Sequence, residues 1–365
     1  MGFKCGIVGL PNVGKSTLFN ALTQTAAAQA ANYPFCTIEP NVGDVAVPDP
    51  RLDTLARIAN SAEIIPTRIT FVDIAGLVRG ASKGEGLGNQ FLANIREVDA
   101  VAHVLRCFED DDITHVEGRI DPVGDADTVE TELMLADLES LEKRIAPLEK
   151  KAKSGEKEAK EQLALMMKAA VLLREGKPAR LAQLSLEERA PYAQLGLMTS
   201  KPVLYVANVD ETSAATGNKY SKLVEERAKA EGARAVVISA RVEEEIAQLP
   251  NDERQDFLDS IGLEEPGLNR MIRVGYELLG LLTFFTAGPK ETRAWTVTKG
   301  SRAPQAAGVI HTDFEQGFIR AETIAYADYV AGKGEAGARD AGKFRLEGKD
   351  YIVADGDVMH FRFNN

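Results

Sequence analysis

A glycine-rich stretch near the start of the chain constrains the fold more than any other feature. Residues 9–17 read GLPNVGKST and match the phosphate-loop pattern G-x-x-x-x-G-K-[ST]. The apolar run of residues 3–8 predicts a buried strand before the loop, and residues 16–22 predict a helix after it. A chance glycine loop would not be expected to carry both the Lys-Ser pair and this context. We therefore predict a nucleoside triphosphate site on an α/β fold.

The backbone of this loop and two of its side chains each hold part of the expected ligand. Glycines let backbone N–H groups turn inward around phosphate oxygens, and the N-terminus of the following helix adds partial positive charge. Lys15 is expected to reach the β- and γ-phosphates, where it assists the chemistry. The Ser16 hydroxyl is expected to bind Mg²⁺.

Two further segments are expected to complete the phosphate side of the site. Asp73 and Gly76 form a D-x-x-G sequence at the end of the strand predicted at 68–73. An aspartate there holds Mg²⁺ through water, and the Gly76 N–H can contact the γ-phosphate. Thr37 lies between the first helix and the second strand, where a threonine can close on the Mg²⁺ of the triphosphate state. The alternative for Thr37 is an ordinary loop threonine.

The residues that would place the attacking water differ from the usual pattern. Many switch GTPases carry a Gln just after D-x-x-G, whereas this chain has Leu77, which cannot orient a water. Four glycines between 80 and 88 predict a mobile switch segment. His115 follows a polar loop past the carboxyl end of a predicted strand, and ligand-binding and catalytic residues lie at such ends in open α/β sheets. We take His115 as the candidate for positioning water, a surface histidine being the alternative, and expect slow intrinsic turnover. His103 lies in a predicted central strand, and we expect a satisfied core histidine there.

The expected base-recognition segment departs from the guanine-specific pattern. Guanine readers carry Asn-Lys-x-Asp, whereas this chain has Asn208, Val209, Asp210 and Glu211 at that place. The longer acid of Glu211 shifts the acceptor, and adenine offers a 6-amino donor, so ATP is favoured over GTP. A GTPase of the same fold is the alternative. Ser239, at the end of the last predicted strand, matches the loop whose backbone contacts the base.

Apolar runs alternate with helical patterns over the first 240 residues. The predicted strands are 3–9, 42–47, 68–73, 100–106, 202–207 and 234–239. Strands that alternate with helices predict a mainly parallel sheet covered on both faces.

A helical hairpin is expected to interrupt this alternation at residues 127–199. The apolar stripes of its two helices are Met134, Leu138, Leu141, Ile145 and Leu148, and then Leu163, Met167, Ala170 and Leu173. Residues 153–156 break the pattern at the turn. Lysines flank this turn, diluted by glutamates. They indicate either a solvated tip or contact with an acidic macromolecule such as RNA.

The C-terminal part changes character at about residue 281. Glycine-rich turns separate short runs that predict strands at 283–286, 292–297, 318–322, 349–354 and 358–363, with a helix at 323–329. This pattern is typical of a small α+β module with its own core.

Composition excludes several classes of function. The 365 residues carry a net charge of −12, while residues 281–365 are neutral, so the remainder is acidic. That balance argues against broad nucleic-acid binding, and we expect no sequence-specific DNA partner. No apolar run reaches the roughly 18 residues of a membrane span, and the first residues run into a strand rather than a signal peptide. Three cysteines without metal spacing are typical of reduced cytosolic thiols.

Taken together, these motifs resemble the YchF/Obg-like ATPase family over essentially the whole chain. The resemblance rests on residues 9–17, 32–40, 73–91 and 208–211. It implies a P-loop domain at 1–280 with the hairpin at 127–199 inserted in it, and a β-grasp TGS domain at 281–365. Such modules often serve as RNA or ribosome adaptors.

The resemblance also implies ligands and partners. It carries the nucleotide-contacting loop onto Asn12, Val13, Gly14, Lys15, Ser16 and Thr17, the Mg²⁺ ligands onto Ser16 and Thr37, and an adenine contact onto the Val209 backbone. Asn12 resembles the phosphate-loop asparagine that supports K⁺ activation in some relatives. The family prefers ATP to GTP and associates with ribosomes.

These observations predict a slow, cytoplasmic, Mg²⁺-dependent ATPase switch that acts as a monomer. Its expected partner is the ribosome, contacted at the large subunit through the hairpin and the TGS domain. The alternative from a different functional class is a nucleotide-sensing adaptor whose hydrolysis is incidental. Leu77 is compatible with this alternative, because it cannot orient the attacking water. A metabolic kinase is disfavoured, because no small-substrate pocket is evident in the sequence.

Overall fold

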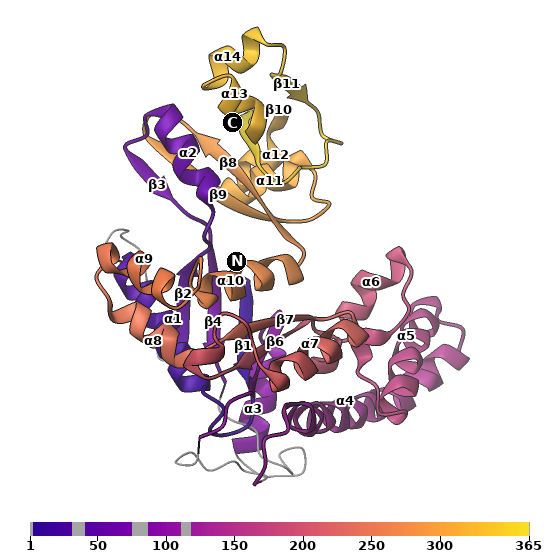
Figure 1. The fold of residues 1–365 in the computed structure, drawn as a ribbon. Helices are drawn as coiled ribbons and strands as arrows, with labels where there is room; N and C mark the ends of the chain where they lie inside the picture. Colours follow the sequence, from indigo (N-terminus) through magenta and orange to yellow (C-terminus); the bar gives the residue numbers. More distant parts are fainter. Residues whose placement is uncertain (1–2, 31–40, 75–86, 111–117, 365) are drawn as a thin grey trace. The chain divides into compact units, whose positions relative to one another are not determined.

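The computed structural model describes residues 3–30, 41–74, 87–110 and 118–364, which form two compact units (Figure 1). The first unit is built mainly from the N-terminal 25 residues and residues 70–271. The second is built mainly from residues 44–69 and 272–365. Among the described residues, no helix combines the length and apolarity needed to cross a membrane.

The first unit is organised on a six-stranded sheet of order β2-β4-β1-β5-β6-β7. Neighbouring strands from β4 to β7 pair in parallel. The strands are β1 (Lys4–Val8), β2 (Val42–Ala46), β4 (Arg68–Asp73), β5 (Ala100–Arg106), β6 (Val203–Asn208) and β7 (Arg234–Ile238). All six predicted strands are therefore confirmed, with ends that differ by one residue at most. Every residue of β5 and β6 is buried, as expected for apolar central strands covered on both faces.

Helices connect and cover these strands (Figure 1). They are α1 (Lys15–Ala30), α3 (Leu87–Arg96), α7 (Lys219–Glu231), α8 (Ala240–Gln248) and α9 (Asn251–Ser260). α10 (Gly267–Leu278) begins in the first unit and ends in the second. α7 packs against β6 and β7. It begins at a capping box in which the Asn218 side chain accepts from backbone N–H groups, and it ends at Gly232 in the left-handed region.

The predicted helical hairpin is present as α4 (Pro122–Lys153) and α5 (Lys157–Arg174), with α6 (Leu186–Ala193) beside it. α4 begins five residues before the predicted start, because Asp121 caps it and Pro122 occupies the first turn. On α5 the predicted stripe is confirmed at Ala170 and Leu173, which are buried, but it is wrong at Met167, which is 38% exposed. The buried face also includes Met166 and Ala169, because α5 packs against α6 and the short helix η1 (Ala179–Leu181) as well as α4.

A buried polar cluster joins the base of this hairpin to the sheet. The Arg180 guanidinium lies 2.6 Å from the carboxylates of both Glu130 on α4 and Glu231 on α7. The Tyr205 hydroxyl on β6 lies 2.8 Å and 2.9 Å from the same two carboxylates. Arg227 reaches both carboxylates from α7. Because removing one member would leave a buried charge unpaired, the cluster fixes α4 and α7 in one arrangement.

The second unit holds another six-stranded sheet, of order β11-β10-β12-β8-β9-β3. The first and last strands of its C-terminal part, β8 and β12, are adjacent and parallel, which is the β-grasp arrangement. The strands are β3 (Glu63–Ile65), β8 (Leu281–Ala287), β9 (Glu291–Thr298), β10 (Phe318–Ala325), β11 (Arg345–Glu347) and β12 (Asp357–Phe363). The helices are α2 (Pro50–Ala59), α11 (Ala303–Ile310), α12 (Thr312–Gln316), α13 (Tyr326–Ala331) and α14 (Glu335–Asp340).

Two expectations for this unit need correction. The run 349–354 is no strand, and only Ile352 forms an isolated bridge, to Arg302. The first three residues of the predicted helix 323–329 continue β10, because their side chains are apolar or β-branched and pair with β12. α2 and β3 lie in the same compact unit as residues 272–365, because β3 pairs with β9.

Candidate nucleotide site

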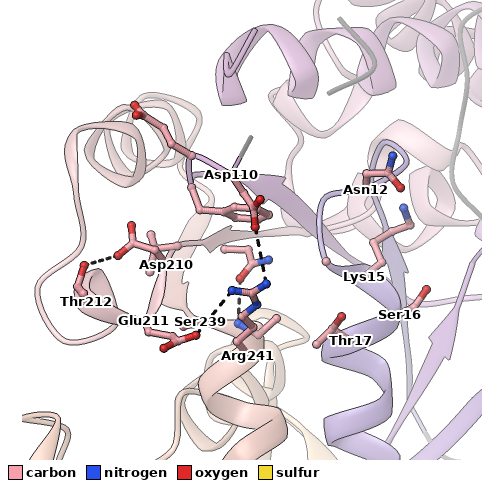
Figure 2. A pocket seen from close by; sticks show the side chains of 16 residues that line it. Asn12, Lys15, Ser16, Thr17, Asp110, Asp210, Glu211, Thr212, Ser239 and Arg241 are labelled. Carbon is pink, nitrogen blue, oxygen red and sulfur yellow. Dashed lines mark hydrogen bonds and ion pairs between the residues drawn. The ribbon is translucent and has the colours of Figure 1, made fainter. Parts of the chain in front are cut away.

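A pocket of about 610 Å³ opens in the first unit at the carboxyl ends of β5 and β6, where ligands bind in open α/β sheets (Figure 2). Its volume falls within the ~300–1,000 Å³ of ordinary ligand sites. Four segments line it, with the phosphate loop on one side and the predicted base segment on the other. The lining residues lie at 12, 14–17, 108–110, 208–212 and 239–241.

The backbone of the phosphate loop requires glycine at two positions. Gly9 has φ 154° and Gly14 has φ 93°, both in the region that favours glycine. A Cβ atom on Gly9 would lie 2.5 Å from the Val104 carbonyl oxygen, and one on Gly14 would overlap the Asn208 side-chain amide. Asn12 also adopts positive φ, at 62°, which asparagine tolerates. α1 begins at Lys15, so its first N–H groups lie next to the pocket.

Lys15 is held as a buried ammonium inside this loop. Its side chain is 8% exposed, and Nζ donates to the Leu10 carbonyl oxygen at 2.5 Å. Burial lowers the Lys15 pKa to about 8, and the nearby Asp73 carboxylate partly opposes that shift. The pKa of Asp73 is raised by its own burial and lowered by Lys15. A polyphosphate would replace the weak carbonyl partner with charged oxygens, so the loop is suited to an anion.

The depressed pKa of Lys15 predicts a pH dependence of nucleotide affinity. Below pH 8 the free protein holds the ammonium that phosphate needs, and above it binding must take up a proton. Affinity is therefore expected to be full below pH 8 and to fall by up to about tenfold per pH unit above it. Titrations from pH 7.5 to 9.5, where phosphate is fully ionised, measure this. The Lys15→Arg variant keeps its charge and should give a flat profile, and a flat wild-type profile would contradict the assignment.

Asn208 links the two sides of the pocket rather than standing free to contact a base. Its Nδ2 donates to the Val13 carbonyl oxygen at 2.9 Å, and its Oδ1 accepts from the Ala240 N–H at 2.9 Å. Its own carbonyl oxygen accepts from the Cys107 N–H at 2.8 Å. The side chain is buried. Asn208 therefore fixes the phosphate loop against the first turn of α8.

The remaining residues predicted to contact the base line the pocket, but they differ in how many of their polar groups are free to bind a ligand. Val209 donates its N–H to Ile238, so a backbone contact from Val209 to a base would have to use its carbonyl oxygen. Asp210 accepts from the Ser213 N–H and turns toward Thr212 (Figure 2), whereas Glu211 is half exposed. Ser239 is buried, and its hydroxyl has no hydrogen-bond partner within the described part of the chain. A buried hydroxyl of this kind on a pocket wall is suited to a ligand contact.

Two of the three predicted metal ligands can be placed. Ser16 is exposed in the first turn of α1, and Asp73 ends β4, where it pairs in register with Ile7 of β1. Both offer the hard oxygen atoms that Mg²⁺ prefers. Nowhere in the described ranges do three or more His, Cys, Asp or Glu side chains form a metal cluster. That suits Mg²⁺, which usually combines one or two protein ligands with water and substrate phosphates.

Three predicted site residues, Thr37, Gly76 and His115, lie outside the described residues, so their roles stay predictions. His103 is buried as expected, but its Nε2 has no hydrogen-bond partner among the described residues, so it is not the satisfied histidine that the sequence suggested. Burial lowers its pKa to about 3, which keeps the ring neutral.

Sequence reasoning did not assign several residues of the pocket wall to the site, among them Phe108, Asp110 and Arg241. Arg106, at the end of β5, donates to the carbonyl oxygens of Phe108 and Asp110 at 3.2 Å and 3.0 Å. Its guanidinium also lies 4.7 Å from the centre of the Phe108 ring. Phe108 and Asp110 follow the carboxyl end of a strand, a position that could have marked them as wall residues.

Comparison with known proteins agrees with this site. A family model described as "50S ribosome-binding GTPase" matches residues 4–137. A second, named YchF-GTPase_C and described as "Protein of unknown function (DUF933)", matches residues 281–364.

Relatives match the whole chain. "Ribosome-binding ATPase YchF" of Haemophilus ducreyi is 61% identical, and that of Bacillus subtilis is 55% identical, each with 100% of both chains covered. The solved structure of the Schizosaccharomyces pombe YchF GTPase is 39% identical and superposes with a TM-score of 0.89, covering 99% of this chain and 98% of that one. The Schizosaccharomyces pombe structure shares the α/β fold with a P-loop sheet and a second sheet at the C-terminus. With these identities over the whole chain, the chain belongs to the YchF family.

Proposed function

We propose that this protein is a Mg²⁺-dependent ATP-hydrolysing switch that binds ribosomes. The observation that carries the proposal is the pocket itself. A phosphate loop with a buried lysine forms one side, and the other side has Val209 and Glu211 at the positions where a guanine reader has Lys and Asp. The curated relatives are named ribosome-binding ATPases, whereas the fission yeast structure is titled a GTPase. The choice of base is therefore part of the proposal.

Each group in the site has a proposed task. The N–H groups of residues 12–17 and the Lys15 ammonium hold the phosphates, and the wall formed by residues 208–212 and 239–241 holds the base. Ser16 and Thr37 ligate Mg²⁺ directly and Asp73 holds it through water; the ion neutralises charge that develops on the phosphates. Gly76 contacts the γ-phosphate, and His115 positions water because Leu77 cannot. K⁺ at Asn12 is a further proposed activator.

The proposed partner is the ribosome, contacted at its large subunit. The printed names of the curated relatives and of the family model at 4–137 support this partner. The hairpin and the second unit, proposed as a TGS domain, would provide the contacts. Lysines and glutamates mix on the exposed end of the hairpin, at residues 149–161. We propose that the protein works as a monomer in the cytoplasm, where ribosomes are.

The test is phosphate release from ATP, measured with and without added ribosomes. The proposal expects slow turnover by the protein alone and faster turnover with ribosomes. The Lys15→Ala variant should show neither. Tight ATP binding without ribosome-stimulated release would instead support the nucleotide-sensing adaptor.

A further inference from the structure

Arg241 occupies an unusual place in the nucleotide pocket. It is the second residue of α8, and its guanidinium lies between two acidic side chains from two other loops (Figure 2). Nη2 is 3.7 Å from Asp110 Oδ2 in the loop after β5, and Nη1 is 3.8 Å from Glu211 Oε1 in the loop after β6. The Arg241 side chain is 67% exposed, so it stands at the open side of the pocket.

By pairing with the Glu211 carboxylate, Arg241 can keep that carboxylate from accepting a hydrogen bond from a nucleotide base. Glu211 stands at the position where a guanine-specific site places the acceptor for N1–H and the 2-amino group. The neighbouring Asp210 is already engaged with Thr212 and Ser213, so it does not offer the same acceptor. Pairing with Arg241 neutralises Glu211 and draws its oxygen atoms toward the guanidinium.

Arg241 also changes the pattern of donors that a base would meet. A guanidinium has five N–H donors and no acceptor. Adenine presents an acceptor at N1, whereas guanine presents a donor there and another at its 2-amino group. At its N1 and 2-amino edge, a guanine base would therefore present donors to the donors of the guanidinium, and unpaired polar groups are costly in a pocket. An adenine base offers the guanidinium an acceptor, and its ring offers a face on which a planar guanidinium can stack.

We propose that Arg241 determines base specificity, by withdrawing Glu211 from guanine and presenting donors to adenine. This inference rests on the proposed function, because it takes the pocket to hold a nucleotide. It assigns discrimination to a residue outside the 208–211 segment. Because both ion pairs are partly exposed and therefore weak, the expected change in specificity is about fivefold, which corresponds to about 1 kcal/mol.

The experiment is displacement of a fluorescent nucleotide by ATP and by GTP from the full-length protein. The readout is the ratio of the two affinities. Loss of one positive charge weakens the binding of ATP and of GTP to the same extent and leaves the ratio of their affinities unchanged. A change in the ratio therefore reports on base specificity and not on the loss of charge. We expect Arg241→Ala to lower the ATP-over-GTP preference by about fivefold, mainly through tighter GTP binding. Lys222→Ala, which removes an exposed charge on α7, should leave the ratio as in the wild type.

A double variant separates the two contributions. If Glu211 is the acceptor that Arg241 withdraws, Arg241→Ala combined with Glu211→Gln should lose the GTP affinity gained by the single variant. A ratio in Arg241→Ala within twofold of a wild type that prefers ATP would overturn this inference alone. A wild-type protein that prefers GTP, or that binds neither nucleotide, would contradict the proposed function itself.

Discussion

Replacing Lys15 with alanine is expected to abolish measurable nucleotide binding. The substitution removes the only buried ammonium among the described residues of the phosphate loop, and with it the charge-assisted contacts to two phosphates. At about 1.5–3 kcal/mol for each such contact, affinity should fall at least about 100-fold. Displacement of a fluorescent nucleotide measures the loss, and Lys222→Ala on α7 serves as the control.

Thermal unfolding shows whether the Lys15→Ala variant is intact. Because Lys15 is buried with a lowered pKa, its ammonium costs the free protein desolvation energy. Its removal should therefore leave the melting temperature of the nucleotide-free protein unchanged or slightly higher. Unchanged nucleotide affinity in a folded variant would refute the site assignment.

Replacing Asn208 with alanine should damage both the fold and the nucleotide site. The change leaves the Val13 carbonyl oxygen and the Ala240 N–H without their partner in a buried setting. Two such losses are expected to cost about 2–4 kcal/mol in the free energy of unfolding. Because the phosphate loop is no longer tied to α8, nucleotide affinity should fall at least about tenfold.

Urea denaturation and nucleotide titration measure these two effects of Asn208→Ala. Asn20→Ala, at an exposed position of α1, is the matched control and should behave as wild type. A variant that loses stability but binds nucleotide with wild-type affinity would show that the link between the loop and α8 does not matter for the site.

The first unit could be predicted well because its signals are local. β5 and β6 are buried along their whole length, so their apolar runs are unambiguous. The phosphate loop follows β1 directly. Its glycines occupy positions where any loop of this kind has no room for a side chain. The stripe on α4 was equally readable, because Leu141 and Ile145 pack in the core of the hairpin.

The features that escaped prediction depend on partners far away in the sequence. Asn208 bonds to Val13 across 195 residues, and Arg241 reaches acids on two other loops. β3 is only three residues long and pairs with β9 more than 220 residues later. Met167 is exposed because α6 and η1 help to set which face of α5 is covered, and a stripe read from α5 alone contains no such information.

The central claim, an ATP-specific phosphate-loop site, is tested most directly by competition between ATP and GTP for the wild-type protein in the presence of Mg²⁺. The account predicts that ATP displaces a fluorescent nucleotide at a concentration at least about tenfold lower than GTP, which corresponds to about 1.4 kcal/mol. Tighter displacement by GTP would contradict it, and would mean that Glu211 reads guanine in spite of the altered segment around it.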